Sequence, residues 1–276
     1  MTAQPRVHAG GALDGLLDLV FPRRCVVCRR PGGWLCKECA AELRPLPADR
    51  CRRCGAPLRR AGRPVRPARS GGQGRHMPAC HECAGRDRAF ASASAAFCYT
   101  GPARALVTAC KFRALRSLAD ELATRAAPAF AVTAAQAGAG AVVASVPAHR
   151  DHRLDRGFDL AESLARRLAA GAGLTYAPLL RRVRHGSRQS GLDKASRAAN
   201  VHHAFALRED GLRVGTRLKR VIIIDDVYTT GETLNQCAQA LAHAALDPHV
   251  FTFARTVRAT PVQASRDQAV PKERCR

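Results

Sequence analysis

The chain has 276 residues, which is enough for one large domain or two smaller ones. It is strongly basic, with 45 lysines and arginines, 22 acidic residues and a formal net charge of +23. No apolar run approaches the roughly 18 residues that a membrane span needs, and aspartates interrupt the one apolar stretch near the start, residues 11–22. We therefore expect a cytoplasmic protein without a secretory signal. Its excess charge either covers a solvated surface or binds a polyanion, such as nucleic acid or a phosphorylated substrate.

Residues 1–20 form an N-terminal lead, and the leucine spacing of residues 11–22 predicts a short amphipathic helix. Residues 21–90 follow, with little apolar periodicity and with eight of the twelve cysteines in four CxxC pairs. Reduced cysteines in CxxC turns complete the tetrahedral sulfur shell that Zn²⁺ prefers. A redox pair is the competing interpretation, but redox motifs do not occur in fours. We predict a double zinc ribbon with two structural zinc ions, bound by Cys25, Cys28, Cys36, Cys39, Cys51, Cys54, Cys80 and Cys83.

The sequence leaves the pairing of the four motifs open. Sequential pairing is the simpler arrangement, but the gap from Cys28 to Cys36 is short for a zinc ribbon, so a crossed arrangement also fits. Two zinc ions with eight thiolates would lower the net charge to about +19. Residues 59–75 have little apolar content and predict a flexible basic insertion.

From residue 91 to about residue 258, short apolar runs alternate with alanine-rich helical patterns. This alternation predicts an α/β domain with a mainly parallel sheet and helices on both faces, and residues 259–276 predict a disordered tail. The predicted strands are Ser92–Tyr99, Ala141–Val146, Arg220–Ile224 and His249–Ala254. The predicted helices are Pro102–Phe112, Ser117–Ala126, Gly157–Ala169 and Gly231–Ala244.

The segment VIIIDDVYTTGETL, residues 221–234, carries the clearest chemical signal. Its apolar run predicts a central parallel strand, and the ligand crevice of such a sheet opens at the carboxyl ends of its strands. Two adjacent carboxylates repel, so they need a cation or hydroxyl donors as partners. The threonines and glycine that follow lead into a helix, whose N-terminal N–H groups bind anions. A ribose 5-phosphate has both adjacent hydroxyls for the carboxylates and a phosphate for the helix N-terminus, so the segment predicts a ligand of this kind.

This segment resembles the motif with which type I phosphoribosyltransferases bind 5-phosphoribosyl 1-pyrophosphate (PRPP). From LDLVFPRRC to FTFAR the chain is similar to the ComF family, which comprises competence protein F and GntX-like DNA-utilisation proteins. The segments that carry the likeness occur in the family's order: LCKEC, YTGPARALVTACKF, VPAHRDHRLDRGFDLAESLA, RQSGLDKASRAANVHHAF and the acid-pair loop.

The resemblance implies a role for each matching residue. Catalytic Asp225 and Asp226 would hold the ribose hydroxyls, and PRPP would bind together with Mg²⁺. The 5-phosphate would lie against Thr229, Thr230, Gly231, Glu232 and Thr233. The pyrophosphate and a mobile hood over the site would involve Lys111, Arg150, Arg153, Arg156, Gln189, Ser190, Gly191, Arg197 and Asn200. The chain departs from the family where RGFDL, residues 156–160, replaces the usual RGFNQ, so the usual acceptor does not follow from the resemblance.

Two functions fit these residues. The first is a Mg²⁺-dependent phosphoribosyltransferase, an enzyme of pentosyl transfer whose acceptor the sequence does not name. Glu232 is its candidate general base, although a first-turn acid stabilised by the helix dipole explains that residue better. The second is a non-catalytic single-stranded DNA-binding module of the DNA-uptake machinery that keeps the site for nucleotide binding or sensing. A DNA-uptake or helicase partner protein is compatible with both.

Overall fold

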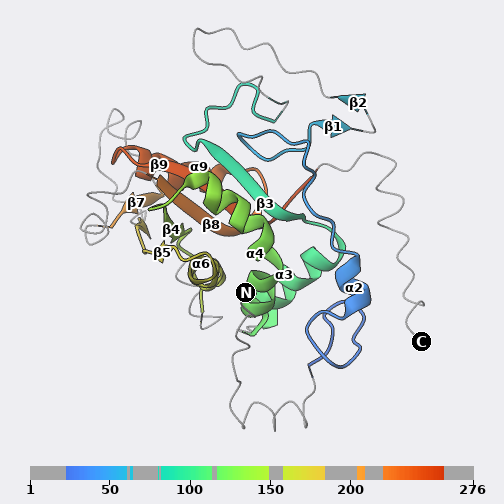
Figure 1. Ribbon diagram of the computed structural model, residues 1–276. Helices are drawn as coiled ribbons and strands as arrows, with labels where there is room; N and C mark the ends of the chain where they lie inside the picture. Colours follow the sequence, from blue (N-terminus) through green and yellow to red (C-terminus); the bar gives the residue numbers. More distant parts are fainter. Residues whose placement is uncertain are drawn as a thin grey trace, which may run out of the picture.

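The computed structural model describes residues 23–60, 63–64, 80, 82–113, 117–148, 158–183, 204–208 and 220–257. Its centre is a five-stranded sheet in the order β3-β9-β8-β4-β5, in which every neighbouring pair is parallel (Figure 1). The strands are β3 (Ser92–Cys98), β4 (Val142–Ser145), β5 (Thr175–Tyr176), β8 (Arg220–Tyr228) and β9 (Asp247–Arg255). The predicted α/β class with a mainly parallel sheet is thereby confirmed.

The apolar run of β8 is continuous because both faces of this central strand are covered. Ile222 and Ile224 pack into one core with Phe251 and Phe253 of β9, while Val221 and Ile223 pack into a second core on the opposite face. β8 continues to Tyr228, beyond the predicted end at Ile224, because β9 still pairs with it there. The acid pair therefore lies within the last residues of the strand pair, not after it.

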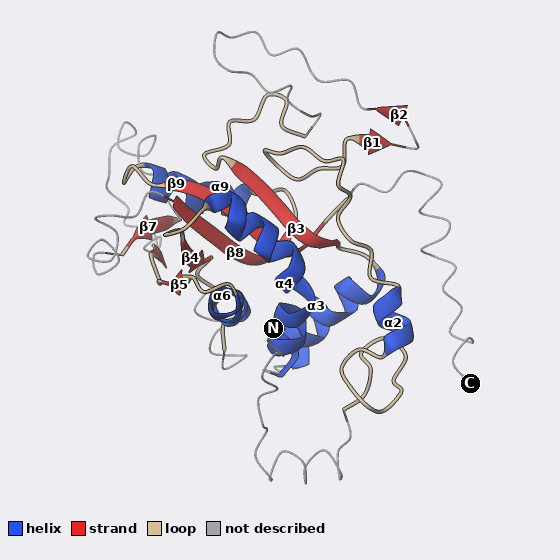
Figure 2. Ribbon diagram, in the orientation of Figure 1, coloured by secondary structure: helices blue, strands red, loops and turns tan. Residues whose placement is uncertain are grey.

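Helices cover both faces of the sheet (Figure 2). On the first face lie α3 (Gly101–Arg113), α4 (Ser117–Ala137) and α6 (Leu160–Gly171). On the second face lies α9 (Glu232–Ala242), which also contacts β7 (Phe205–Leu207) of a small antiparallel pair with β6 (Leu180–Arg182). α4 runs eleven residues beyond its predicted end, and α6 begins at Leu160 because Asp159 caps it. None of the described helices combines the length and apolar character that a membrane crossing requires.

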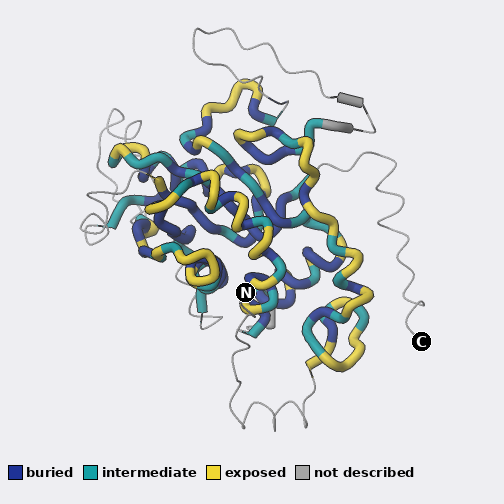
Figure 3. Tube along the Cα trace, in the orientation of Figure 1, coloured by how far each residue is buried: buried dark blue, intermediate teal, exposed yellow. Residues whose placement is uncertain are grey.

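The cysteine-rich segment packs along β3, the edge strand of the sheet. Cys25, Leu35 and Cys39 join the core of the first face, whereas Cys51 and Cys54 join the core of the second face. Between them the chain bonds to β3 itself, through Leu46 N to Ala96 O (3.0 Å) and Cys98 N to Arg44 O (2.8 Å). The zinc-binding segment thus shares its buried interior with both faces of the α/β domain. In Figure 3 its short buried stretches alternate with exposed ones.

The remaining elements of that segment are short. They are α2 (Lys37–Ala41), β1 (Arg59–Arg60) and β2 (Arg63–Pro64), the last two being an antiparallel pair. The predicted basic insertion of residues 59–75 therefore begins with a small hairpin, and most of its other residues lie outside the described part of the chain, as does the predicted tail.

Chain connectivity fixes where a ligand crevice can open. From β4 the chain passes through α6 to β5, and from β8 it passes through α9 to β9, so the two crossovers leave in opposite directions. β4 and β8 are neighbours, and their last paired residues are Ser145 and Ile224. Open α/β sheets bind ligands at the carboxyl ends of strands where such a reversal occurs.

Candidate functional site

The eight predicted zinc ligands form two separate clusters. Cys25, Cys28, Cys36 and Cys39 make the first, and Cys51, Cys54, Cys80 and Cys83 make the second, with all sulfur atoms of a cluster within 4.8 Å of one another. Tetrahedral Zn–S bonds of about 2.3 Å require sulfurs about 3.8 Å apart. The closest pairs measure 3.4–4.0 Å, as for Cys54–Cys80 and Cys51–Cys83, so the donor sets fit zinc. The sequential pairing is correct and the crossed alternative is wrong.

Local backbone geometry explains how each pair converges. In all four motifs the turn closes on itself, and the carbonyl of the first cysteine accepts an N–H from four residues further on: Arg29 N, Ala40 N, Gly55 N and Ala84 N. In the Cys36–Cys39 motif this turn continues as a helix. Cys36 is the N-cap residue of α2 and Cys39 lies in its first turn, and residues three apart on a helix project to the same side. This helix makes the short gap after Cys28 compatible with sequential pairing.

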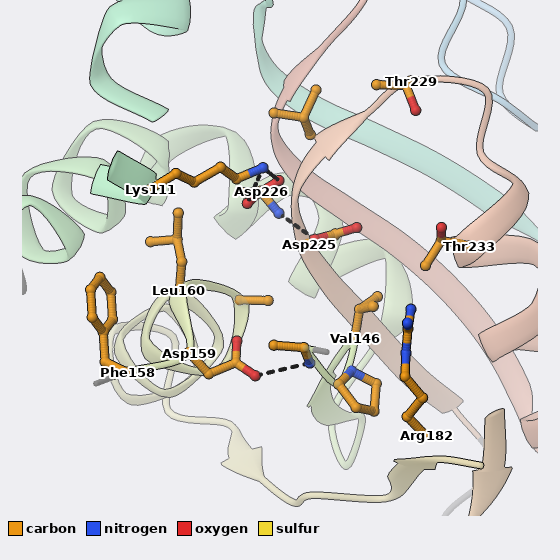
Figure 4. A pocket seen from close by; sticks show the side chains of 14 residues that line it. Lys111, Val146, Phe158, Asp159, Leu160, Arg182, Asp225, Asp226, Thr229 and Thr233 are labelled. Atoms are coloured by element: carbon orange, nitrogen blue, oxygen red, sulfur yellow. Dashed lines mark hydrogen bonds and ion pairs between the residues drawn. The ribbon is translucent and has the colours of Figure 1, made fainter. Parts of the chain in front are cut away.

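A cavity of about 450 Å³ opens at the predicted crevice, between the carboxyl ends of β4 and β8 (Figure 4). Its volume suits a small phosphorylated ligand. Its lining side chains come from both strands and from the elements around them: Lys111, Val146, Pro147, Ala148, Phe158, Asp159, Leu160, Ala161, Arg182, Asp225, Asp226, Val227, Thr229 and Thr233.

The acid pair forms one wall of the cavity. Asp226 is held by Lys111 of α3, whose Nζ lies 2.8 Å from Oδ1 and 2.7 Å from Oδ2. Asp225 Oδ1 accepts the backbone N–H of Asp226 at 2.8 Å. Burial, with repulsion from Asp226, raises the pKa of Asp225 to about 8. Of the two carboxylates, Asp226 is the one that the described residues pair with a cation.

The loop of residues 229–233, called the phosphate loop below, joins β8 to α9. Gly231 is the N-cap residue of α9 and has φ of +77°, a left-handed conformation that glycine adopts without strain. A side chain could not fit there, because a Cβ would lie 2.2 Å from Oη of Tyr228. Thr229 and Thr233 line the cavity, whereas Glu232 is exposed and bonds to Gln236 along the helix. The first-turn interpretation of Glu232 therefore fits its position better than a base role.

Asp159 forms the opposite wall and explains the departure from RGFNQ. Its Oδ1 accepts the N–H of Glu162 at 3.1 Å, which caps α6, and its Oδ2 accepts the N–H of Ala148 at 3.1 Å (Figure 4). Burial raises the pKa of this carboxyl group. A carboxylate has two acceptor oxygens and so serves both N–H groups, one of which lies in the segment after β4. Asp159 thus joins the start of α6 to the segment after β4 on this side of the cavity.

Sequence reasoning missed Arg182, which with Lys111 is a cation among the described residues that line the cavity. It projects from β6, and its guanidinium lies over the ring of Phe205 of β7, 5.0 Å from the centroid. The two strands have three residues each and carry no periodic signal, so only their pairing reveals the position. Figure 4 shows Arg182 on the side of the cavity nearest Thr233.

The structure brings together five of the predicted ligand residues around the cavity: Lys111, Asp225, Asp226, Thr229 and Thr233. Gly231 shapes the loop, and Thr230 uses its hydroxyl to accept from Glu232 N at 3.4 Å. Lys111 lies with the acid pair. The other predicted pyrophosphate and hood residues lie outside the described residues: Arg150, Arg153, Arg156, Gln189, Ser190, Gly191, Arg197 and Asn200.

The raised pKa of Asp225 predicts how stability depends on pH. The pKa is about 8 in the folded chain against an ordinary 3.8, so the stabilisation is complete at low pH and is lost as the pH rises through 8. We expect the free energy of unfolding of the ligand-free chain to fall between about pH 5 and pH 9, relative to that of Asp225→Asn. Urea denaturation of both proteins across this range measures the difference. Parallel curves would contradict the assignment of the titration to Asp225.

Comparison with known proteins gives three kinds of likeness. The family model described as a double zinc ribbon domain matches residues 16–84. Proteins named DNA utilization protein YhgH, from Salmonella typhi and Salmonella typhimurium, are each 27% identical over 247 residues, covering 87% of this chain and 100% of theirs. Competence protein F of Haemophilus influenzae is 32% identical over 97 residues, which cover 35% of this chain and 42% of that protein.

Two solved structures match part of this chain. One is glutamine PRPP amidotransferase from B. subtilis, complexed with ADP and GMP, with a TM-score of 0.31, 24% identity and coverage of 45% of this chain and 24% of that chain. The other is the allosteric regulatory enzyme of purine biosynthesis, with a TM-score of 0.30, 19% identity and coverage of 49% and 30%. This chain matches less than a third of the length of either. The predicted resemblance to the ComF family is confirmed by the relatives: the chain is homologous to proteins named DNA utilization protein YhgH and Competence protein F and has a double zinc ribbon at its N-terminal side.

Proposed function

We propose that this chain binds PRPP with Mg²⁺ and acts as a phosphoribosyltransferase in the use or uptake of external DNA. The observation that carries the proposal is the meeting of the acid pair and the phosphate loop at one cavity, at the reversal point of the sheet. Carboxylates suit the two ribose hydroxyls, and the N-terminus of α9 suits the 5-phosphate. The names of the relatives supply the connection with DNA.

The charges that the described residues bring to the cavity suit a ligand that carries a cation. Among these residues, three carboxyl groups, those of Asp159, Asp225 and Asp226, line the cavity together with two cationic side chains, Lys111 and Arg182. Mg²⁺ would neutralise charge on the departing pyrophosphate. Asp225 and Asp226 would orient the ribose, while the phosphate loop fixes its other end, so that C1 is exposed to an acceptor. Positive character builds on the ribose as the pyrophosphate leaves, and the carboxylates stabilise that charge.

Calorimetric titration of the full chain with PRPP, with and without Mg²⁺, tests the proposal. We expect a dissociation constant in the micromolar range that requires Mg²⁺, with much weaker binding of ribose 5-phosphate because it lacks the pyrophosphate. A screen of bases and amines for pyrophosphate release then identifies the acceptor. Absence of PRPP binding in a correctly folded, zinc-loaded chain would overturn the proposal.

A second function, binding of single-stranded DNA, is favoured by one specific observation. Four arginines of the first zinc ribbon are exposed within eight residues: Arg23, Arg24, Arg29 and Arg30. Cations spaced in this way bind phosphates, and such binding weakens steeply as the salt concentration rises. DNA binding that survives loss of PRPP binding would make this the principal function, with the cavity kept for nucleotide binding or sensing.

A further inference from the structure

Arg255, the last residue of β9, is almost completely buried, with 1% of its surface exposed. Its Nη2 donates to Glu82 Oε2 at 2.6 Å and to Sγ of Cys54 at 3.9 Å. Cys54 is a ligand of the second zinc cluster, and Glu82 lies beside Cys83 of the same cluster. A buried cation is costly unless negative charge compensates it, so the position of Arg255 depends on where Glu82 and Cys54 are held.

Metal loading would fix the positions of these two partners. One ion bound by four sulfurs would join the Cys51–Cys54 and Cys80–Cys83 turns, which carry Cys54 Sγ and Glu82. Among the described residues, Arg255 Nε and Nη1 have no hydrogen-bond partner, so the guanidinium is held mainly by Glu82 and Cys54. A zinc-loaded cluster therefore holds Arg255 in place, whereas without the ion the two turns and the partners that they carry are free to separate.

The guanidinium of Arg255 also lies over the ring of Tyr228, the residue that precedes the phosphate loop. Arg255 Cζ lies 4.1 Å from the centroid of the Tyr228 ring, and Phe90 contacts the ring edge-on at 6.4 Å. The same ring touches Gly231, since a Cβ there would overlap Tyr228 Oη, Cζ and Cε1. A displacement of Arg255 therefore reaches the glycine of the phosphate loop through a single side chain.

Two further hydrogen bonds, from Arg88 and Thr256, hold the backbone of the phosphate loop. Arg88 Nη2 donates to Thr230 O at 2.8 Å, and Thr256 Oγ1 donates to Thr229 O at 3.2 Å. Arg88 is itself held at its carbonyl by Arg53 of the Cys51–Cys54 turn, at 2.8 Å. In a planar trans peptide the carbonyl and the next N–H point in opposite directions. These two bonds therefore point the N–H groups of Thr230 and Gly231 away from Arg88 and Thr256, so that both can donate to an anion.

From these contacts we infer that Arg255 is a positioning residue that links zinc loading of the second cluster to the conformation of the phosphate loop. The first cluster lacks this link, because it packs with the helices of the other face of the sheet. The two zinc ions thus have different roles: the second sets the shape of the ligand site, and the first does not. The consequence for PRPP rests on the proposed function, whereas the consequence for the loop does not.

Hydrogen–deuterium exchange of the peptide that covers residues 228–234 tests the link in the full chain, without any ligand. Cys80→Ser removes the second zinc and Cys28→Ser the first, and metal analysis confirms each loss. We expect Cys80→Ser and Arg255→Met to speed exchange in this peptide about tenfold or more. Cys28→Ser and the matched control Arg125→Met, on the partly exposed surface of α4, should change it less than about twofold. Arg255→Lys keeps the charge and should restore part of the protection.

Protection of the β4 peptide reports in the same experiment whether each variant is folded. Where Arg255→Met fails to fold, Glu82→Gln replaces it and should give the same effect in weaker form. Equal effects of the two cysteine variants, or no effect of Cys80→Ser on the loop, would overturn the link. Calorimetry with Mg²⁺ and PRPP on the two cysteine variants should show about tenfold weaker binding for Cys80→Ser only. If the wild type binds no PRPP, the proposed function fails while the exchange data still decide the link.

Discussion

Asp225→Asn combined with Asp226→Asn is expected to abolish binding of PRPP. Each amide keeps the size of the side chain but cannot ionise, whereas Mg²⁺ and the ribose hydroxyls would favour the ionised form of both carboxyl groups in the complex. The hydrogen bonds from the hydroxyls therefore lose their anionic acceptors. Hydrogen bonds to charged groups contribute about 1.5–3 kcal/mol each, and losing two of them weakens affinity about 100-fold or more. Calorimetric titration in the presence of Mg²⁺ measures the loss.

The same variant should fold at least as well as the wild type near neutral pH. Burial and repulsion from Asp226 raise the pKa of Asp225 to about 8, and uncharged amides remove both the repulsion and the cost of burying a charge. The Lys111 side chain loses its partner but keeps partial access to water. Asp120→Asn, which removes an exposed carboxylate of α4 paired with Arg167, is the matched control and should bind PRPP normally. Retained binding in the double variant would remove the acid pair from the ligand site.

Gly231→Ala is expected to cause a large loss of both stability and binding. The alanine would have to adopt a φ of +77°, and its Cβ would lie 2.2 Å from Oη and 2.4 Å from Cζ of Tyr228. Tyr228 is buried and packed between Arg255 and Phe90, so it cannot move aside cheaply. Left-handed strain and overpacking together destabilise the fold by about 2–5 kcal/mol.

Urea denaturation and PRPP titration measure these two losses. Gly171→Ala is the matched control, because Gly171 ends α6, a Cβ added there would meet no atom within 4 Å, and its φ is not positive. That change should leave the free energy of unfolding equal or slightly higher. A Gly231→Ala protein as stable as the control would mean that Tyr228 does not support the loop.

Much of the sheet, and the acid pair and threonines that line the cavity, could be predicted from sequence, because those features depend on local pattern. The apolar run before Asp225 identifies a central strand, and paired cysteines identify zinc ligands irrespective of their partners. Asp159 shows the limit. Sequence comparison treats it as a lost amide, whereas its two oxygens cap α6 and hold the segment after β4. That role depends on two elements meeting in space.

Residues that act through tertiary packing left no signal in the sequence. Arg255 is one of many arginines, and only the structure reveals that it lies buried between a zinc ligand and Tyr228. The pairing of the cysteines was open for a similar reason. The short gap after Cys28 argues against sequential pairing until α2 is seen to begin directly after Cys36 and to turn Cys39 toward the same ion.

The way the zinc-binding segment lies on β3 has a consequence for the metal-free protein. β3 is an edge strand, and Arg44, Leu46 and Arg52 occupy hydrogen-bonding groups along its outer side. Without zinc the CxxC turns lose the ion that joins them, and wherever the segment leaves β3 the strand would present unpaired N–H and C=O groups to other chains. Exposed edges of this kind recruit further strands and promote aggregation. Zinc thus protects the chain against edge-to-edge association, and zinc depletion would remove that protection.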